Sequence, residues 1–502
     1  MAISNPGAGH SGADGQLNSV AAPQKALLSS NYIDFADGAS NNDWSQQYLP
    51  DLMEKEAEVF GNRTIAGFLA QVGAEEAMSS DQVVWSEQGR LHLSYIGSMV
   101  INSGVFTFST DIDGNTISSG EHGVRINDMV ILATNEGTIK CQVSACDATT
   151  CTLLPYEDED IEDTAAFSAG VTTTGTILVI GSEWGKGVAG QGGTASSTAG
   201  FGSTRPTHTS FSNKPIIIKD YYEVSGSDAS QIGWVEITGE AGQSGYLWYL
   251  KAEGDTRARF SDYLEMTMLE SVKGVAAGST DADHGAGGLT AGNVIGTEGL
   301  FAAVETRGNI TTGVTGVNAA TDLAEFDAIL AEFDSQGAIE ENMMFVNRAT
   351  SLAIDDMLAA MNSYGAGGTS YGVFNNSEDM ALNLGFSGFR RGSYDFYKSD
   401  WKYLNDKATM GAINSRATTA AIRGAIIPAG VSSVYDQALG ANMKRPFLHV
   451  RFRASQTESR KFKTWVTGSV GAATSVLDAM EINMLSERCL ITQGANNFML
   501  FK

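Results

Sequence analysis

The chain has 502 residues, which is enough for three or more domains, each with a core of its own. It carries 58 acidic and 32 basic residues, a formal charge of −26, and residues 1–240 alone hold 30 acidic against 10 basic residues. This acidity argues against tight wrapping of DNA and against adhesion to anionic membranes, because both need clustered positive charge.

The sequence shows no pattern typical of a signal peptide or a membrane helix. The first residues, beginning Met1-Ala-Ile-Ser, lack a basic region followed by an apolar run. No window approaches the ~20 apolar residues of a membrane helix. The four cysteines form no Cys-x-x-Cys pair, which disfavours a zinc knuckle or a redox motif. We expect a soluble protein that folds in a reducing cytoplasm.

The N-terminal part of the chain is polar. Residues 1–45 contain few large apolar side chains, so they are either a disordered tail or an arm that becomes ordered on a neighbouring subunit. Helical spacing of apolar residues predicts two short helices, over residues 50–61 and 64–72. Residues 81–93 alternate weakly and are expected to form an extended hairpin arm.

Short β segments dominate residues 96–190. Residues 124–132, 139–145 and 151–154 are predicted strands, and we interpret the region as a small β-barrel or sandwich inserted into a larger fold. The acidic run at 157–163 is expected to be a solvated loop. Residues 185–205 have the Gly/Ser/Thr composition of a linker.

The second half of the chain mixes helices and strands. The longest helical pattern covers residues 246–273. A second helix is predicted over 322–333, with Thr321 as its cap and Gly337 as its end. A buried strand at 343–346 and a helix from Thr350 to 362 follow, as in half of a layered α/β unit. Strands dominate from 370 onward, and the strand at 488–492, a polar turn and an apolar end are expected to fix the C-terminus in the core.

We find no constellation of catalytic, cofactor-binding or metal-ligating residues. The sequence lacks a Gly-x-Ser-x-Gly elbow, a phosphate-binding Gly-Lys-Ser/Thr and a His-Glu-x-x-His motif. The six histidines are scattered singly and are expected to be ordinary surface residues. The loop at 111–115 has its glycine at the fourth position rather than the sixth, so a hairpin turn is favoured over a calcium loop. Cys141, Cys146 and Cys151 are expected to be buried small hydrophobes, with a soft-metal site as the alternative.

One basic segment stands out from this acidic background. Seven of the 32 basic residues lie between positions 444 and 463, interleaved with aromatic residues: Lys444, Arg445, Arg451, Arg453, Arg460, Lys461 and Lys463. Such mixtures can bind nucleic acid. The overall acidity favours another use, in which this basic face meets the acidic N-terminal half of a neighbouring copy. A solvated strand face is the alternative. Exposed ion pairs contribute little singly, but they fix orientation and register between subunits.

The order of these parts resembles the Hong Kong 97-type fold of the major capsid proteins of tailed bacteriophages. The segments that carry the resemblance are Val-Val-Trp-Ser-Glu-Gln-Gly-Arg-Leu at 83–91, Ala-Glu-Phe-Asp-Ala-Ile-Leu at 324–330, Met-Met-Phe-Val-Asn at 343–347 and Glu-Arg-Cys-Leu-Ile-Thr-Gln-Gly-Ala-Asn-Asn-Phe at 487–498. None of these segments identifies the family by itself, and the resemblance depends on their order along the chain. The overall sequence pattern is similar to that of capsid proteins of crAss-like and related phages.

The resemblance implies an α+β fold with six parts: an N-terminal arm with short helices at 1–75, an extended loop at 76–100 and 205–240, an inserted β domain at 101–204, a peripheral domain with a spine helix at 241–345, an axial domain at 346–440, and C-terminal strands completing the core at 441–502. The insertion departs from the minimal family pattern. The resemblance further implies contact with the neighbouring subunit through Trp85, Glu87, Arg90, Arg390 and Arg391, together with the seven basic residues of 444–463.

The implied function is that of a non-enzymatic shell protein without cofactors. Copies made in the bacterial cytoplasm would assemble into the pentamers and hexamers of an icosahedral virion capsid. Portal, scaffold and auxiliary or decoration proteins would be its partners, and the shell would enclose double-stranded DNA without reading its sequence. No covalent crosslink and no membrane contact are expected. The alternatives are an encapsulin-like compartment and a β-rich phage tail or surface protein.

Overall fold

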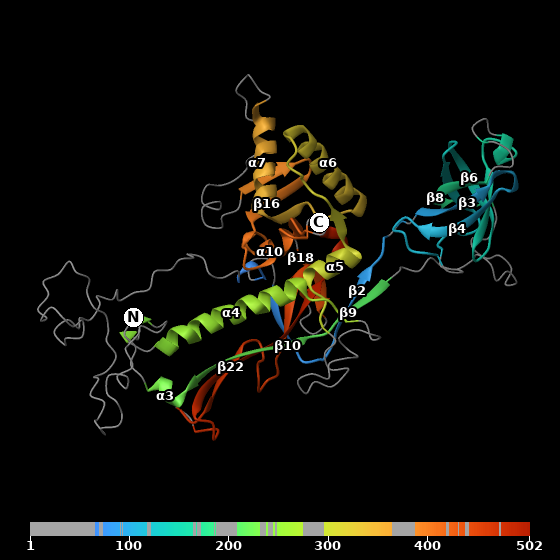
Figure 1. The fold of residues 1–502 in the computed structure, drawn as a ribbon. Coiled ribbons are helices and arrows are strands. Elements are labelled where there is room, and N and C mark those ends of the chain that lie inside the picture. Colours follow the sequence, from blue (N-terminus) through green and yellow to red (C-terminus); the bar gives the residue numbers. More distant parts are fainter. Residues whose placement is uncertain are drawn as a thin grey trace, which may run out of the picture. The chain divides into compact units, whose positions relative to one another are not determined.

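The structure is a computed structural model of the chain (Figure 1). It describes residues 66–502 except for 70–73, 91, 93, 118–121, 164–166, 168–171, 185, 187–207, 231–236, 239–243, 246–247, 275–295, 364–386, 418–420, 430, 437–440 and 471–472. The chain divides into one compact unit at residues 81–213 and a second made of 1–80 and 214–502. The predicted arm at 1–45 and the helix at 50–61 lie outside the described residues, as does most of the predicted helix at 64–72.

The unit at 81–213 contains a closed antiparallel barrel, as the sequence predicts for a small barrel or sandwich. Its strands are arranged β3-β4-β7-β6-β5-β8. They are β3 (Ser94–Val100), β4 (Val105–Asp111), β5 (Asp128–Thr134), β6 (Thr138–Cys146), β7 (Thr150–Pro155) and β8 (Thr172–Ser182). Alternate side chains point inward along each strand, and the core includes fully buried Met99, Phe106, Leu132, Leu153 and Ile177.

Two expectations for the barrel need correction. The strand predicted over 124–132 begins only at Asp128, because Asn127 has a left-handed φ of 67° and Asp128 accepts a hydrogen bond from the Arg125 amide. The acidic run at 157–163 is largely exposed, as expected, but it ends in a short 3-10 turn, η4 (Ile161–Asp163). Ile161 is buried in the barrel core and anchors this loop.

A two-stranded ribbon belongs to the same unit. Strand β2 (Val83–Gln88) pairs antiparallel with β9 (His208–Asn213), in a register from Val83 opposite Asn213 to Gln88 opposite His208. The expectation of an extended arm is confirmed for residues 83–88, and the second strand of the arm comes from the far side of the barrel in sequence.

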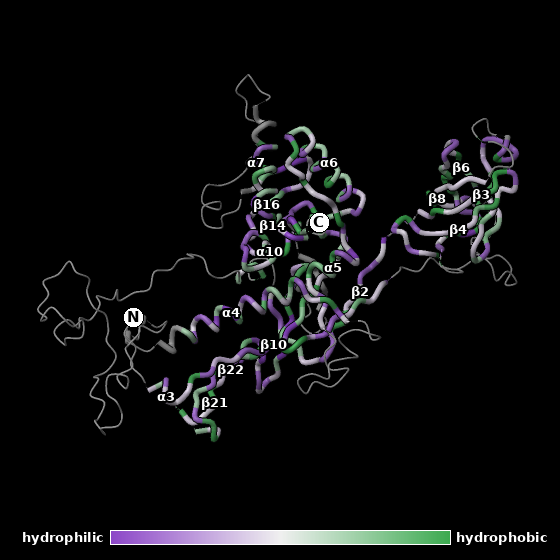
Figure 2. The backbone as a smooth tube through the Cα atoms, in the orientation of Figure 1, coloured by the Kyte–Doolittle hydropathy of each residue, from purple (hydrophilic) through white to green (hydrophobic). Residues whose placement is uncertain are grey.

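The second unit is built partly on a five-stranded sheet. Its strands are β1 (Ala74–Met78), β20 (Leu448–Arg453), β22 (Ala479–Thr492), β10 (Ile216–Ser225) and β21 (Lys463–Gly468). Helix α4 (Trp248–Glu270) lies along β10 and β22 (Figure 1). It is the long helix predicted over 246–273. Phe260 and Leu264 of α4 pack against Ile482 and Met484 of β22, and hydrophilic and hydrophobic stretches alternate along the helix (Figure 2).

A six-stranded sheet forms the other part of this unit. Its order is β13 (Asn309–Thr311), β23 (Met499–Phe501), β17 (Gly424–Pro428), β14 (Glu341–Val346), β16 (Tyr394–Asp400) and β15 (Ser387–Arg391). Helices α6 (Ala319–Gln336) and α7 (Arg348–Ser363) pack together beside it (Figure 1). Strand β14 runs to Val346 and pairs with β16 on one side and β17 on the other. The division into a peripheral domain ending at 345 and an axial domain starting at 346 stays a prediction.

The helix caps differ by a few residues from expectation. The side chain of Asn318 accepts a hydrogen bond from the Thr321 amide at 3.0 Å, so Asn318, and not Thr321, caps α6. The side chain of Asn347 accepts a hydrogen bond from the Thr350 amide at 2.8 Å. Asn347, and not the predicted Thr350, therefore caps α7. Gly337 does end α6, with a φ of 64°.

The C-terminus is fixed in the core, as predicted. The strand expected at 488–492 is the end of the longer β22, Gly494 turns the chain with a φ of 60°, and buried β23 is inserted between β13 and β17. The remaining elements are η3 (Ile101–Ser103), α3 (Gly226–Ala229), β11 (Ile237–Thr238), β12 (Ser244–Gly245), α5 (Leu300–Arg307), α9 (Lys402–Asn405), α10 (Met410–Asn414), β18 (Val431–Asp436), β19 (Ala441–Pro446) and η5 (Ala495–Asn497).

Replacing Phe260 by alanine should loosen α4 from its sheet. Phe260 is fully buried and its ring meets that of Phe462 edge-on at 5.3 Å, so Phe260→Ala is expected to cost ~3 to 5 kcal/mol of stability. Tyr263 lies three residues along the same helix and is 43% exposed, so Tyr263→Ala is the control. Denaturant titration of both variants measures the difference, and equal midpoints would contradict this packing.

Candidate functional site

Strand β20 carries two of the basic residues expected to contact a neighbour, and both have acidic partners in the same chain. Arg451 lies beside Glu76 of β1 in the parallel register, with 2.8 Å between Nη2 and Oε2. Arg453 lies 3.6 Å from Glu487 of β22. Strand β20 is therefore flanked on each side by a strand that supplies carboxylates.

Glu487 is the acidic centre of this part of the sheet. Its side chain is 9% exposed, and its carboxylate forms ion pairs with Arg460, at 2.8 Å, and with Arg453. A carboxylate buried to this degree needs such partners, because the loss of hydration is not otherwise offset. The two arginines offset that loss.

Glu75 and Arg488 continue the cluster. Lys461 pairs with Glu75, and Arg488 lies 3.9 Å from the same carboxylate. Arg488 also donates hydrogen bonds to Ser486 Oγ and to the Lys461 carbonyl, both at 2.9 Å. Burial lowers the pKa of the Arg488 guanidinium, and Glu75 acts in the opposite direction. Lys461 also lies over the ring of Phe452, 5.5 Å from its centroid.

Five of the seven predicted contact residues in 444–463 are thus engaged within the chain. The fifth, Lys463, pairs with Glu458 at 2.6 Å and lies 5.7 Å from the ring centroid of Trp465. The side chains of Lys444 and Arg445 lie outside the described residues. The expected meeting with an acidic neighbour stays a prediction. Glu75 and Glu76, which belong to the acidic N-terminal half, meet this basic segment of their own chain.

Sequence reasoning missed the acidic half of the cluster. Residues 74–78 read Ala-Glu-Glu-Ala-Met, a composition with little strand propensity. They form β1 because the edge of β20 offers backbone partners and cations. No local signal would have found this pairing.

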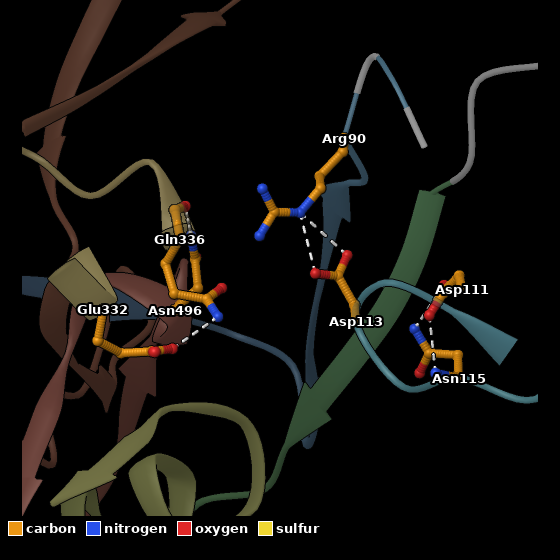
Figure 3. A network of polar contacts seen from close by, with 7 residues as sticks. All are labelled: Arg90, Asp111, Asp113, Asn115, Glu332, Gln336 and Asn496. Carbon is orange, nitrogen blue, oxygen red and sulfur yellow. Dashed lines mark hydrogen bonds and ion pairs between the residues drawn. The ribbon is translucent and has the colours of Figure 1, made fainter. Parts of the chain in front are cut away.

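The predicted contact residues on the ribbon also have intrachain partners. Trp85 is buried and donates a hydrogen bond from Nε1 to Glu87 Oε1 at 2.9 Å, and its ring lies 6.2 Å from that of Phe211 on the paired strand. Arg90, just beyond β2, donates from Nε to both carboxylate oxygens of Asp113 at 2.9 and 3.1 Å (Figure 3).

The loop that Asp113 occupies is the hairpin turn favoured above over a calcium site. The Asp111 carboxylate accepts hydrogen bonds from the backbone and side-chain nitrogens of Asn115 at 2.8 and 3.0 Å (Figure 3). These two hydrogen bonds, to a residue four positions on, satisfy the aspartate within the turn. Among the described residues, no group of three or more His, Cys, Asp or Glu is placed to hold a metal ion.

The remaining predicted contact residues lie on β15. Arg391 donates from Nε and Nη2 to the two carboxylate oxygens of Asp327 on α6, at 2.6 and 2.7 Å. Arg390 lies 3.7 Å from Asp395 and is 58% exposed. Elsewhere on α6, Glu332 accepts from Gln336 at 3.1 Å, and the Gln336 carbonyl accepts from Asn496 at 3.2 Å (Figure 3). The Asn496 contact ties the C-terminal turn to the end of α6.

A second polar contact that the sequence did not indicate lies on α4. Glu265 is buried and accepts hydrogen bonds from the amides of Gly67 at 2.7 Å and Leu69 at 3.1 Å. Between them, Phe68 stacks on Trp401 at 4.5 Å and meets Phe345 edge-on at 4.6 Å. Burial raises the pKa of the Glu265 carboxyl, and the three amides of residues 67–69 act in the opposite direction.

The cysteines are buried small side chains in the part of the chain that the structure describes. Cys141, Cys146 and Cys151 lie in the barrel core, where Cys146 and Cys151 face each other across the β6–β7 pair, and all three are free thiols. Burial raises the pKa of Cys141 to about 12 and that of Cys146 to about 11. These thiols stay protonated near neutral pH and are poor nucleophiles.

One histidine differs from expectation. His449 lies in β20 and is 1% exposed, so it is not an ordinary surface residue. Among the helices that the structure describes, none is both long and apolar enough to cross a membrane.

Comparison with known proteins gives distant structural likenesses only. No family model and no curated protein matches the chain significantly. A structure from Microbacterium phage Oxtober96 is 9% identical and covers 90% of this chain and 95% of that one, with a TM-score of 0.38. A structure from Mycobacterium phage Bobi is 7% identical, covers 89% and 94%, and has a TM-score of 0.34. The capsid structure of cyanophage P-SCSP1u is 9% identical, covers 61% and 78%, and has a TM-score of 0.30. At these TM-scores the likenesses establish neither fold nor function.

Removing the charge of Glu487 should destabilise the second unit. Glu487→Gln leaves two partly buried arginines without their carboxylate, and we expect a loss of about 2 kcal/mol. Glu458→Gln, at the exposed pair with Lys463, is the control and should cause no measurable change. Denaturant titration measures both variants, and a Glu487→Gln protein as stable as the control would refute a structural role for the cluster.

Glu265 should contribute a pH dependence to stability. Because its pKa is raised above the ordinary 4.5 in the folded chain, the folded state binds this proton more tightly than the unfolded state. The stability it contributes is therefore present at low pH and is lost as the pH rises through the raised pKa.

Wild type should accordingly gain stability relative to Glu265→Gln as the pH falls from neutrality to about 5. Denaturation midpoints of both proteins across this range provide the test, because contributions from other groups cancel in the difference. A difference that is constant, or that shrinks toward acid pH, would show that the carboxyl is not perturbed in this direction.

Proposed function

We propose that this chain is a structural subunit of a bacteriophage capsid, with the Hong Kong 97-type fold. The observation that carries the proposal is the order and pairing of its elements. A two-stranded ribbon comes from residues 83–88 and 208–213, a 23-residue helix lies along a 14-residue strand, and a second sheet is completed by the C-terminal strand. This is the order of parts that the family resemblance implies.

The ribbon supports assembly with other copies. Within the described residues, β2 and β9 pair only with each other, and a two-stranded ribbon is marginally stable by itself in water. Val84 on this ribbon is 62% exposed. A neighbouring subunit that covers Val84 would add apolar burial to a ribbon with two open edges. Pentamers and hexamers are the assemblies we propose.

The charge distribution suits a container for DNA. The chain is strongly acidic, and the five basic residues of 444–463 whose side chains are described are neutralised by carboxylates of the same chain. Such a surface lets enclosed double-stranded DNA move without strong binding. The proposed location is the virion, and the proposed partners are portal, scaffold and auxiliary capsid proteins of a tailed phage, crAss-like or related.

A shell subunit performs no turnover, and the described residues are consistent with a non-enzymatic role. The thiols are protonated, and the carboxylates of the cluster around Glu487 are held in ion pairs. The ion pairs of the cluster join neighbouring strands of the sheet, which is a structural use of these carboxylates.

The purified protein, alone or with a scaffold protein, should assemble into closed particles visible by negative-stain microscopy and light scattering. Val84→Asp should lower the particle yield several-fold without changing the melting temperature, because it places a charge where the proposed contact buries a methyl group. Val317→Asp is the control, since Val317 is 70% exposed in the other unit.

A protein that stays monomeric under all assembly conditions would refute the capsid proposal. Normal assembly of Val84→Asp would refute only the role of the ribbon. Small uniform particles that exclude DNA would favour an encapsulin-like compartment instead.

A further inference from the structure

The outer wall of the barrel carries an apolar patch that the shell role does not account for. Four large apolar side chains lie on β7 and β8 or directly after β7 and are exposed by 39 to 47%: Leu154, Tyr156, Leu178 and Ile180. Small domains rarely leave several such side chains together on one face unless a partner covers them.

Strand register places these side chains in two neighbouring rows. Across β7, β6, β5 and β8, one row runs Tyr156, Lys140, Ile131, Leu178. The next row runs Leu154, Gln142, Met129 and Ile180, the last at the bulge opposite Met129. Six of the eight positions are apolar, and we define them as the wall patch.

The wall patch is hollowed. A cavity of about 180 Å³ opens among Met129, Lys140, Tyr156 and Ile180, with Glu157 at its border. The Tyr156 hydroxyl donates to Glu183 Oε2 at 2.7 Å, which fixes the ring beside the cavity. A cavity of this size accommodates part of an inserted apolar side chain.

The negative charge around the wall patch favours a positively charged partner. Residues 94–182 contain 12 acidic residues against two basic ones, Arg125 and Lys140. The acidic run at 157–163 starts immediately after Tyr156. Its first four members, Glu157 to Asp160, are exposed, and we call them the acidic rim. A second copy of the barrel would bring one acidic rim against another, whereas a segment with Lys or Arg would be attracted.

The closed barrel also restricts how a partner binds. Strands β3 to β8 leave no open edge, so a peptide cannot extend this sheet by strand addition. Contact must be made by side chains on the face of the wall. We propose that the wall patch binds a protein segment that inserts an apolar side chain into the cavity and places flanking Lys or Arg residues over the acidic rim. This proposal does not depend on the shell role.

The test uses the full-length chain labelled with ¹³C at its methionine methyl groups, with the Met129 resonance assigned through Met129→Leu. The probe is a short amphipathic peptide of leucine and lysine, compared with the same peptide carrying glutamate for lysine. We expect the lysine peptide to shift the Met129 resonance saturably, and the glutamate peptide to leave it unchanged.

Ile180→Lys and Leu154→Lys should each weaken binding of the lysine peptide about tenfold or more, because they remove apolar burial and add repulsion. Ile112→Lys is the matched control, since Ile112 is 48% exposed on the same barrel outside the wall patch. All three positions are exposed, so the melting temperature should not change, and two independent patch variants guard against misfolding of one.

Four results would each overturn the proposal: no saturable shift, equal binding of the glutamate peptide, unchanged binding by both patch variants, or self-association of the full chain that Ile180→Lys abolishes. The last result would assign the wall patch to a second copy of this chain. A failure of particle assembly has no bearing on any of them.

Discussion

Strand β22 is the element on which the larger unit depends. Its 14 residues pair with β10 along one edge and with β21 and β20 along the other. The same strand contributes Ile482 and Met484 to the contact with α4 and Glu487 to the ion pairs with Arg453 and Arg460. One continuous backbone ladder therefore joins the apolar packing to the polar cluster. After β22 the chain turns at Gly494, passes through η5 and enters buried β23.

The polar cluster around Glu487 provides partners for the buried polar residues of this long strand. A central strand buries both of its faces, yet positions 486–488 are polar or charged. Such groups are costly inside a protein unless they are paired. The arginines of β20 and its following loop, together with Glu75 of β1, supply the partners. The ion pairs of Glu75 and Glu76 also link β1 to β20 and to the loop after it. The paired residues of β1 and β20 lie 375 positions apart in the chain (Ala74 opposite His449).

The two units use their acidic residues differently. In the larger unit, carboxylates neutralise nearby cations and fix strand register. In residues 94–182, acidic residues outnumber basic ones six to one, and Glu157 to Asp160 are exposed beside the apolar wall patch. The first arrangement favours internal order, and the second favours recognition of an oppositely charged partner.

The sequence by itself determined the elements whose signals are local. Side-chain alternation predicted three of the six barrel strands, β5, β6 and β7. Apolar spacing predicted α4 within a few residues, and Gly337 marked the end of α6. The order of parts suggested the family, and the basic segment at 444–463 was visible from composition alone. These features depend on hydrophobic periodicity and on turn residues, and both are set by residues that are close together in the sequence.

Only the tertiary structure decided which residues face one another. No neighbouring residue in the sequence indicates that Glu75 and Glu76 lie in a strand. The same is true of the ion pairs of Glu487 with two arginines and of the hydrogen bonds that Glu265 accepts from the amides of Gly67 and Leu69. The two rows of the wall patch likewise depend on strand register, including the bulge that places Ile180 beside Met129. Pairings between distant segments depend on backbone register and shared burial, and these are properties of the whole fold rather than of any single segment.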